Sequence, residues 1–462
     1  VILVCSLFTW IVPSGEYQRE TKTIEGKERT LLVPGTYEHV DKEITLKGAL
    51  LEVEAEGTAT PVSFQGYLTA IPRGLEEAAD IIFFIFMIGG VFGILEKTGV
   101  ITAGIGRLID RLGGRGPVLV IVLMTVLAIG GSTLGMGEEF IPLVPVFLLV
   151  SKRLGYDRIF GMAIVLLGAE VGFAASTTNP FTVYVAQGIA ELPLGSGMPL
   201  RIVFLFCALI VAVAYILRYG ARIKADPSAS LMADDPFDLG DDVDRTEEFT
   251  GRHQAILLIC TVLFVFILIA VQRFGWWMAD MGGGFLLMGI VAVLISRMGL
   301  DEATDAFVKG MRDMVVAALV VGFARGISVV LYDGMILDTI VHAAASILGQ
   351  LPRAVAAIGM LTFESTLNFL IPSGSGQAAV TMPLMAPLSD ILGLHRQVAV
   401  LAFTCGDGFS NSVIPTSGIL MAMLALAKIP YGKWLRFMVP LFVMLMTLSA
   451  VFLVIAVLIG YS

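Results

Sequence analysis

Long apolar stretches make up most of this chain, and four short polar segments interrupt them. Two of these breaks, residues 131–139 and 176–180, lie in the first half, and two, residues 365–377 and 407–418, lie in the second. Each pair follows one layout: an apolar run, a break, an apolar run that contains proline, a turn, and an apolar run with the second break. A pattern that returns half a chain later predicts an internal duplication.

Individual residues at matching places support the duplication. Ser132-Thr133-Leu134 matches Ser365-Thr366-Leu367 at the first break of each pair. Three single residues and one dipeptide also match: Pro142 with Pro383, Gly155 with Gly393, Arg158 with Arg396, and Gly172-Phe173 with Gly408-Phe409. We therefore divide the main part of the chain into a first half, 80–217, and a second half, 255–462, joined by an acidic linker, 218–254.

Composition excludes a soluble protein. Of the 462 residues, 56% are hydrophobic and only 15% are charged, and the mean hydropathy is +0.87. A chain this apolar is typical of an all-α polytopic membrane protein, whose surroundings are the lipid bilayer. The formal charge of −9 arises largely in two polar stretches, 16–79 and 225–248, and gives no indication of a nucleic-acid partner. The four cysteines fall within apolar runs without metal-ligand spacing, so they predict packing rather than a metal site.

The N-terminal region predicts a partial membrane span and then a polar segment. Residues 1–12 are apolar but shorter than the ~20 residues that cross a bilayer, so we expect the second half of a helix that begins before residue 1. Alternating residues around Pro34-Gly35 predict a small β-hairpin, and 64–80 predict an amphipathic helix on the membrane surface. The basic residues Lys97, Arg107, Arg111 and Arg115 follow the span 81–96, which places them in the cytoplasm and residues 13–79 outside.

The first half continues with a predicted re-entrant hairpin, 117–150. Both of its ends adjoin basic turns, and we expect each arm to be too short to span, so the break at 131–139 would form the tip. A broken helix, 159–190, then crosses outward and 200–217 return to the cytoplasm. The linker contains the acidic piece 234–244, which we interpret as a solvated connection.

The second half repeats this plan from the opposite face of the membrane. Spans at 255–271, 284–296 and 314–331 bring the chain outside, so the hairpin 352–392 begins and ends there. The broken helix 397–427 crosses inward and 437–460 finish outside. The prediction is two inverted repeats, with 81–96, 200–217, 255–271 and 437–460 as candidate scaffold helices.

The breaks are the predicted binding site. Non-helical backbone survives at membrane depth only against protein or a wet cavity, so four breaks indicate a shared cavity. Helix ends there offer N–H groups to a carboxylate and carbonyls to a cation. The residues that we expect to bind substrate are Ser132, Thr133, Glu138, Glu139, Ser176, Thr177, Thr178, Asn179, Ser365, Thr366, Asn368, Ser373, Ser375, Asp407, Asn411, Ser412, Thr416 and Ser417.

Acidic residues predict that the cavity is negatively charged. Glu138, Glu139, Glu170, Glu364 and Asp407 lie in or beside the breaks, and the break windows contain no lysine or arginine. Intramembrane carboxylates either carry protons or face a cation, and we favour Glu138 or Glu139 and Asp407 because glycines adjoin them. Arg325 and His342 on neighbouring elements are alternative counter-charges, although helix packing explains them more simply.

Several stretches resemble the YfcC branch of the DcuC-type C4-dicarboxylate-carrier family, within the ion-transporter superfamily. The resemblance covers essentially the whole chain and rests on Thr9–Tyr17, Val33–Tyr37, Phe83–Gly99, Asn368–Ala378 and Asp407–Ser412. It implies opposed hairpins, a scaffold and a mobile transport domain that moves like an elevator, a homodimer, and residence in a bacterial inner membrane. Members of this branch are often described as basic amino-acid exchangers. The Ser-Asn-Thr motifs of the related sodium/dicarboxylate symporters are matched only approximately, by Ser176-Thr-Thr-Asn179 and Ser410-Asn-Ser412.

The prediction is therefore a secondary transporter and not an enzyme. Its substrate would be a cationic amino acid such as arginine or ornithine, moved by exchange or proton coupling; the alternative is a carrier of C4-dicarboxylates or other organic anions coupled to Na⁺ or H⁺. Candidates for ion coupling are Glu138, Asn179, Asp407 and Asn411, and no other cofactor is expected. Ser373 and Ser375 have no histidine or lysine in the break windows to act as a base, which argues against an intramembrane enzyme. Opposed closed hairpins argue against a channel.

Overall fold

Helices dominate the computed structural model, which describes residues 1–24, 27–53, 57–104, 107, 116–237, 249–274, 276 and 278–462. Within these ranges six helical segments are long and apolar enough to cross a membrane: Ala79–Lys97, Gly116–Leu134, Met198–Ala225, Met278–Ser296, Leu300–Asp333 and Tyr431–Ile459. The predicted class, a mostly helical multi-pass membrane protein, is confirmed. Arg111, Arg115 and residues 238–248 of the linker lie outside the described residues.

The helices form two packed groups. The first, which we call the break body, is built around one large hydrophobic core, to which Ile82, Ile85 and Ala318 of the second group also contribute. It contains α6 (Gly116–Leu134), the 3₁₀ helix η1 (Glu138–Leu143), α7 (Val144–Arg153), α8 (Arg158–Ala174), α9 (Val183–Ile189), α10 (Met198–Ala225), α16 (Arg353–Asn368), α17 (Gly374–Ile391), α18 (Arg396–Ser410), α19 (Gly418–Ala427) and α20 (Tyr431–Ile459).

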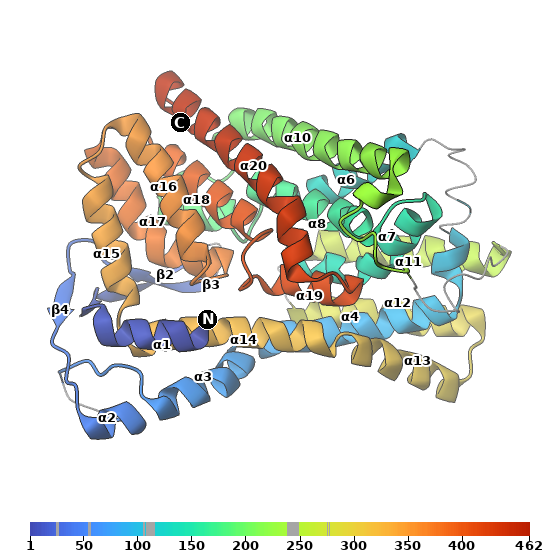
Figure 1. Ribbon diagram of the computed structural model, residues 1–462, viewed down its shortest axis with the longest axis horizontal. Coiled ribbons are helices and arrows are strands. Elements are labelled where there is room, and N and C mark those ends of the chain that lie inside the picture. Colours follow the sequence, from blue (N-terminus) through green and yellow to red (C-terminus); the bar gives the residue numbers. More distant parts are fainter. Residues whose placement is uncertain are drawn as a thin grey trace.

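The second group, the flanking body, lies along one side of the first (Figure 1). It contains α1 (Ile2–Ile11), α2 (Leu46–Leu50), α3 (Phe64–Glu77), α4 (Ala79–Lys97), α11 (Gly251–Phe274), α12 (Met278–Ser296), α13 (Leu300–Asp313) and α14 (Val315–Asp333). Helix α15 (Leu337–Leu348) lies beside α16 and α17 instead (Figure 1). In Figure 1, α1, α14, α4 and α12 run as a layer beneath the break body, and α14 packs against α19.

The broken helices α8 and α18 lie at the centre of the break body. Every residue of α18 from Gln397 to Ser410 is buried. Glycines allow the backbones to approach: a Cβ added at Gly172 would lie 2.1 Å from the Ala128 carbonyl oxygen of α6, and one at Gly408 would lie 2.4 Å from Ala174 Cα of α8. Small residues at such crossings are the usual basis of close helix packing in membranes.

The packing of α10 and α20 differs from the expected scaffold role. Helix α10 packs on α8, and α20 packs on α16 and α18, so both belong to the body that contains the breaks. By contrast, α4 and α11 lie in the flanking body. The apolar pattern of the sequence does not show which body a helix packs into, because each of these helices is apolar on several faces.

The breaks are shorter than predicted. Helix α6 runs through Ser132 and Thr133 to Leu134, and α16 continues through Ser365 and Thr366 to Asn368. At 19 residues, α6 is long enough to span, so the expectation that each hairpin arm is too short is wrong for this arm. The side chains of Thr133 and Thr366 bond the carbonyls of Ile129 and Thr362, one helical turn earlier, which keeps these polar residues compatible with the helix.

Residues 13–40 form two small antiparallel sheets instead of one hairpin at Pro34-Gly35. Strand β1 (Ser14–Glu16) pairs with β4 (Glu38–Val40), and β2 (Arg19–Ile24) pairs with β3 (Lys27–Leu32). Pro34-Gly35 does lie in a turn, but this turn joins β3 to β4, which have different partners. Turn residues identify a reversal of the chain, whereas strand pairing depends on the tertiary contacts of both strands.

This N-terminal segment is held on α15. Arg19 pairs with Asp338 at 2.9 Å, and the Tyr17 hydroxyl lies 2.8 Å from His342 Nδ1. The ring of Tyr37 stacks on His342 at 4.0 Å. Burial and the nearby Asp338 carboxylate raise the pKa of Tyr17 to about 12. His342 is therefore committed to contacts with this segment and does not supply a counter-charge to the breaks.

The start of the linker contacts the first residue of α8. After the 3₁₀ turn η2 (Pro227–Ala229), Met232 is buried and Asp235 pairs with the buried Arg158 at the start of α8. The Arg158 guanidinium also lies 4.8 Å from the centre of the Phe237 ring. Met232, Asp235 and Phe237 thus depart from the expected solvated connection, whereas Asp226, Pro227, Ser228, Ala233, Asp234 and Pro236 are exposed.

Arg158 and Arg396 make reciprocal contacts between the two halves of the chain. Arg158, the first residue of α8, donates from Nη1 to the carbonyl of Ala427 at the end of α19 at 3.5 Å. Arg396, the first residue of α18, donates from Nη1 to the carbonyl of Ala190 at the end of α9 at 2.9 Å. A cation at a helix C-terminus satisfies free carbonyls and complements the helix dipole.

Candidate functional site

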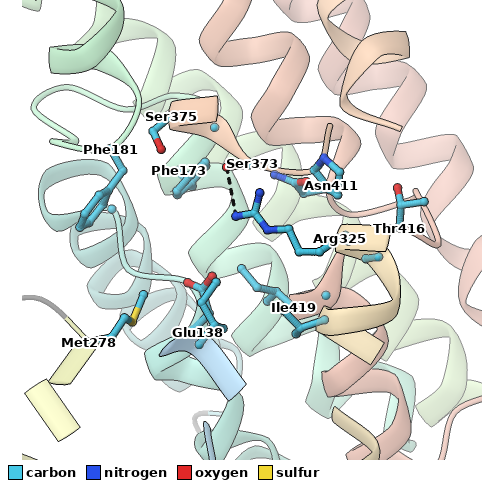
Figure 2. A pocket seen from close by; sticks show the side chains of 18 of the residues that line it. Glu138, Phe173, Phe181, Met278, Arg325, Ser373, Ser375, Asn411, Thr416 and Ile419 are labelled. Atoms are coloured by element: carbon cyan, nitrogen blue, oxygen red, sulfur yellow. Dashed lines mark hydrogen bonds between the residues drawn. The ribbon is translucent and has the colours of Figure 1, made fainter. Parts of the chain in front are cut away.

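Three of the four breaks line one cavity of about 170 Å³ at the junction of the two bodies, and Phe173 and Phe181 on either side of the break 176–180 also line it (Figure 2). The break body contributes most of the wall: Gly135, Glu138, Glu139, Phe173, Phe181, Pro372, Ser373, Gly374, Ser375, Asn411, Thr416, Ser417, Gly418 and Ile419. The flanking body contributes Ile81, Met278, Val321, Ala324 and Arg325.

The first break brings two carboxylates to the cavity. Gly135 has a φ of +68°, and a Cβ there would lie 2.4 Å from Asn179 Oδ1, so this position requires glycine. The chain then turns into η1 with Glu138 and Glu139 half-buried at its start. One oxygen of Glu139 accepts a hydrogen bond from the Gly137 N–H at 2.9 Å.

The second break is fastened to the first. The N–H of Thr177 donates to Ser132 Oγ at 3.0 Å, and the N–H of Thr178 donates to the Ser132 carbonyl at 3.2 Å. Asn179 Oδ1 accepts from the Phe181 N–H at 2.8 Å. These residues satisfy the freed backbone groups of α6 and α8, which is what non-helical backbone at this depth requires.

A buried arginine that the sequence analysis missed also supports this break. Arg201, on α10, is 1% exposed and donates from Nη1 to the Ser176 carbonyl at 3.4 Å and to Thr404 Oγ1 at 3.3 Å. It lies outside the break windows in the sequence, so only its position in an otherwise apolar helix could have indicated it.

The third break places the N-terminus of α17 at the cavity. Ser373, Gly374 and Ser375 face the space, and Ser373, the N-cap, makes no side-chain capping bond to the first turn of the helix. Figure 2 shows Arg325 extending from α14 toward Ser373, with Glu138 below it in this view. The Arg325 Nη2 atom lies 3.5 Å from Ser373 Oγ.

The fourth break is held by Asn368. Its Nδ2 donates to the Asp407 carbonyl and Ser410 Oγ, both at 2.8 Å, and to Asn411 Oδ1 at 2.9 Å. Behind the break, Trp434 Nε1 donates to the Ser412 carbonyl at 2.8 Å. Asn411, Thr416 and Ser417 are left facing the cavity.

Asp407 lies behind the cavity wall and does not line it. It is completely buried, and a Cβ added at Gly374 would lie 3.2 Å from its Oδ2, so the carboxylate sits behind the N-terminus of α17. Among the described residues its two oxygens have no hydrogen-bond partner, and the same holds for Asn368 Oδ1 and Thr416 Oγ1. Unsatisfied oxygens of this kind can accept a small cation such as Na⁺, or a proton on the carboxylate.

The other two acidic residues near the breaks are also buried away from the cavity. Glu170 is 4% exposed on α8. Glu364 accepts a hydrogen bond from Gln377 Nε2 at 2.6 Å within the second hairpin. In the described part of the chain, no cluster of three or more histidine, cysteine or acidic side chains could hold a metal ion.

The predicted site residues fall into three sets. Those that line the cavity are Glu138, Glu139, Ser373, Ser375, Asn411, Thr416 and Ser417. Those that lie behind it and hold the breaks together are Ser132, Ser176, Thr177, Thr178, Asn179, Asn368, Asp407 and Ser412. Thr133, Ser365 and Thr366 remain helical and do not line the cavity, because the breaks begin after them.

Arg325 changes the predicted electrostatics of the site. The break windows indeed contain no basic residue, but α14 brings this guanidinium into the cavity that Glu138 also lines. Arg325 lines the cavity, a position that agrees with the alternative of a counter-charge. The lining thus carries two carboxylates and one guanidinium.

Comparison with known proteins gives one family. The chain matches the family model for the C4-dicarboxylate anaerobic carrier, DcuC, over residues 1–458. It is 34% identical to Escherichia coli (strain K12) YfcC, whose name proposes a basic amino acid antiporter, over 100% of this chain and 95% of that protein. It is 29% identical to an uncharacterized protein of Haemophilus influenzae (strain Rd), over 99% and 95% of the two chains.

Two solved transporter structures also align with the chain. The YdaH transporter of Alcanivorax borkumensis covers 100% of this chain and 97% of its own, with a TM-score of 0.46 and 16% identity. Neisseria gonorrhoeae MtrF, described as illuminating a class of antimetabolite efflux pumps, covers 99% and 94%, with a TM-score of 0.46 and 17% identity.

Proposed function

The chain belongs to the DcuC family of membrane carriers, and we propose that the solute it carries is a cationic amino acid such as arginine or ornithine. The observation that carries this proposal is the charge of the cavity lining. Glu138 and Glu139 supply two carboxyl groups and Arg325 supplies one guanidinium. A cationic amino acid has the complementary set, with two positive groups and one carboxylate. Opposite charges placed at matching positions are favoured where water is scarce.

The lining also suggests how the solute is oriented. Ser373 and Ser375 at the N-terminus of α17 offer hydroxyl and backbone N–H groups to the α-carboxylate. The positive groups then face Glu138 and Glu139 at the first break. Asn411 and Thr416 can bond the remaining polar atoms. The name of the Escherichia coli relative agrees with this substrate class.

A second candidate is a C4-dicarboxylate or another organic anion, coupled to Na⁺ or H⁺. Arg325 and the N-terminus of α17 favour one carboxylate, and the unsatisfied oxygens of Asp407, Asn368 and Thr416 offer a position for a cation. The carboxylates of Glu138 and Glu139 would repel the second carboxylate of such a solute unless cations bind with it. This reading therefore requires strict ion dependence.

Alternating access would come from movement of the break body against the flanking body, as in an elevator. The cavity lies at their junction, and its flanking wall is apolar apart from Arg325 in the described chain, which suits a sliding surface. The reciprocal contacts of Arg158 and Arg396 support two inverted repeats with opposed re-entrant hairpins. A homodimer in a bacterial inner membrane, and coupling by exchange or by protons through Glu138, Asn179, Asp407 or Asn411, complete the proposal.

A thermal-shift screen of the detergent-purified protein tests the substrate class. A ligand that binds the folded state raises the unfolding midpoint once its concentration exceeds its Kd. We expect arginine and ornithine to raise the midpoint without sodium. Citrulline, which lacks the charged side-chain group, and alanine serve as controls and should have little effect. Stabilisation by succinate only with sodium would favour the second candidate, and no stabilisation by any of these solutes would contradict both.

A further inference from the structure

Arg325 is the one charged side chain that the flanking body contributes to the described lining of the cavity. The other lining residues of this wall, Ile81, Met278, Val321 and Ala324, are apolar. Every other polar or charged lining side chain, including Glu138 and Ser373, belongs to the break body. The charges of the site are therefore divided between two bodies that must move relative to each other if the proposed transport cycle holds.

Arg325 occupies the position that we assign to the substrate carboxylate. Its Nη2 atom lies 3.5 Å from Ser373 Oγ at the N-terminus of α17, and Glu138 lines the same cavity. Figure 2 shows the guanidinium between these two residues. Without a solute, Arg325 is the positive group that the structure places among the two carboxylates of the lining.

An empty break body would have to leave this positive charge behind when it moves. Glu138 and Glu139 would then pass an apolar wall without a partner, and an unpaired carboxylate in an apolar environment is strongly unfavourable. With a cationic amino acid bound, its two positive groups pair with the carboxylates. Its α-carboxylate takes the place of Arg325 on Ser373 and the α17 N-terminus. Each charged group of the solute and of the break body then has a partner that moves with it.

We propose that Arg325 holds the unloaded break body in place and thereby makes this carrier an obligate exchanger. The inference rests on the proposed function, because it assumes a cationic amino acid substrate and relative movement of the two bodies. Arg325 then restrains the carrier when it is empty. The break body supplies most of the groups that bind the solute. A solute that satisfies only one carboxylate would release the break body poorly.

Efflux from proteoliposomes tests the assignment. Vesicles containing the protein are loaded with radiolabelled arginine and diluted into buffer with or without unlabelled arginine. We expect the unmodified protein to release label only when arginine is outside. Arg325→Gln should raise release into arginine-free buffer at least tenfold while exchange persists, because the empty break body is no longer held. Arg325→Lys, which keeps the charge, should retain the requirement for external arginine.

Two further variants serve as controls for the efflux experiment. Arg312→Gln removes a positive charge from the last turn of α13, away from the cavity lining, and should leave efflux unchanged. Arg325→Met is a second neutral variant if the glutamine variant is not monodisperse. Persistent exchange without release into arginine-free buffer in a folded neutral variant would overturn the assignment. Loss of exchange in both neutral variants would also overturn it and make Arg325 a substrate ligand. No binding or exchange of cationic amino acids by the unmodified protein would refute the proposed function itself.

Discussion

At the scale of single residues, exposure to the cavity separates two carboxylates that have similar sequence surroundings. Glu138 and Asp407 both adjoin glycines in or beside a break. Glu138 lines the cavity, whereas Asp407 is fully buried behind Gly374. A solute in the cavity can therefore contact Glu138 directly, while Asp407 is placed for a small ion or a proton.

Neutralising Glu138 should weaken binding of the proposed substrate. A hydrogen bond to a charged partner contributes ~1.5–3 kcal/mol, so Glu138→Gln should raise the Kd for arginine by at least about tenfold. Isothermal titration of the purified protein measures this change. Glu302→Gln on the exposed surface of α13 is the matched control and should leave the Kd unaltered. Equal affinity in the unmodified protein and Glu138→Gln would remove this carboxylate from the site.

At the scale of elements, the breaks depend on close contact between the helices that flank them. Helix α6 lies against α8, and α16 lies against α18, with glycine where the backbones meet. Side chains near the ends of these helices then satisfy the opened backbone, as Ser132 and Asn368 do. The polar site is thus supported by an apolar contact at its back.

Gly172→Ala should disrupt this contact, although alanine is normally the better helix former by ~1 kcal/mol. The added Cβ would lie 2.1 Å from the Ala128 carbonyl oxygen, so α6 and α8 must separate. We expect a lower thermal unfolding midpoint and less monodisperse protein in detergent. Gly283→Ala on α12, where a Cβ would have no atom within 4 Å, should leave the midpoint equal or slightly higher. A midpoint for Gly172→Ala equal to that of this control would contradict the packing argument.

At the scale of the whole molecule, the site lies where the break body and the flanking body meet. Helix α14 carries Arg325 in the flanking body and packs against α19 of the break body. Val321 and Gly418 are in direct contact at this junction. If the bodies slide past each other during transport, a covalent bond between these residues must stop the cycle.

A disulfide between Val321→Cys and Gly418→Cys should therefore lock the carrier reversibly. A Cβ built on Gly418 lies 3.3 Å from Val321 Cβ, close to the ~3.5–4.5 Å of natural disulfides. In a background without the four native cysteines, oxidation should abolish arginine exchange in proteoliposomes and reduction should restore it. Each single-cysteine variant serves as the control. Unimpaired exchange by fully cross-linked protein would rule out movement at this junction.

Sequence alone determined the class of the protein and the location of its breaks. Apolar transfer free energies add up residue by residue, so membrane helices are visible without tertiary information. The four polar interruptions are equally visible because backbone amides cannot be left unsatisfied in an apolar medium. The resemblance to the DcuC family, which the family match confirms, and the prediction of duplicated motifs came from the same local patterns.

Only the tertiary structure decided which polar residues share the cavity. The hydroxyls of Thr133 and Thr366 bond carbonyls of their own helices, and Asp407 is buried behind the cavity lining. These placements depend on where each helix ends and how it is rotated, which packing partners far away in the chain decide. Arg325 enters the site from α14, 48 residues before Ser373. The pairing of Arg158 with Asp235 and the pairing of strands in the two small sheets also depend on the tertiary structure. Electrostatic interactions, hydrogen bonds and close contacts act between residues that become neighbours only after folding. The set of residues that form the site is therefore decided by the tertiary structure.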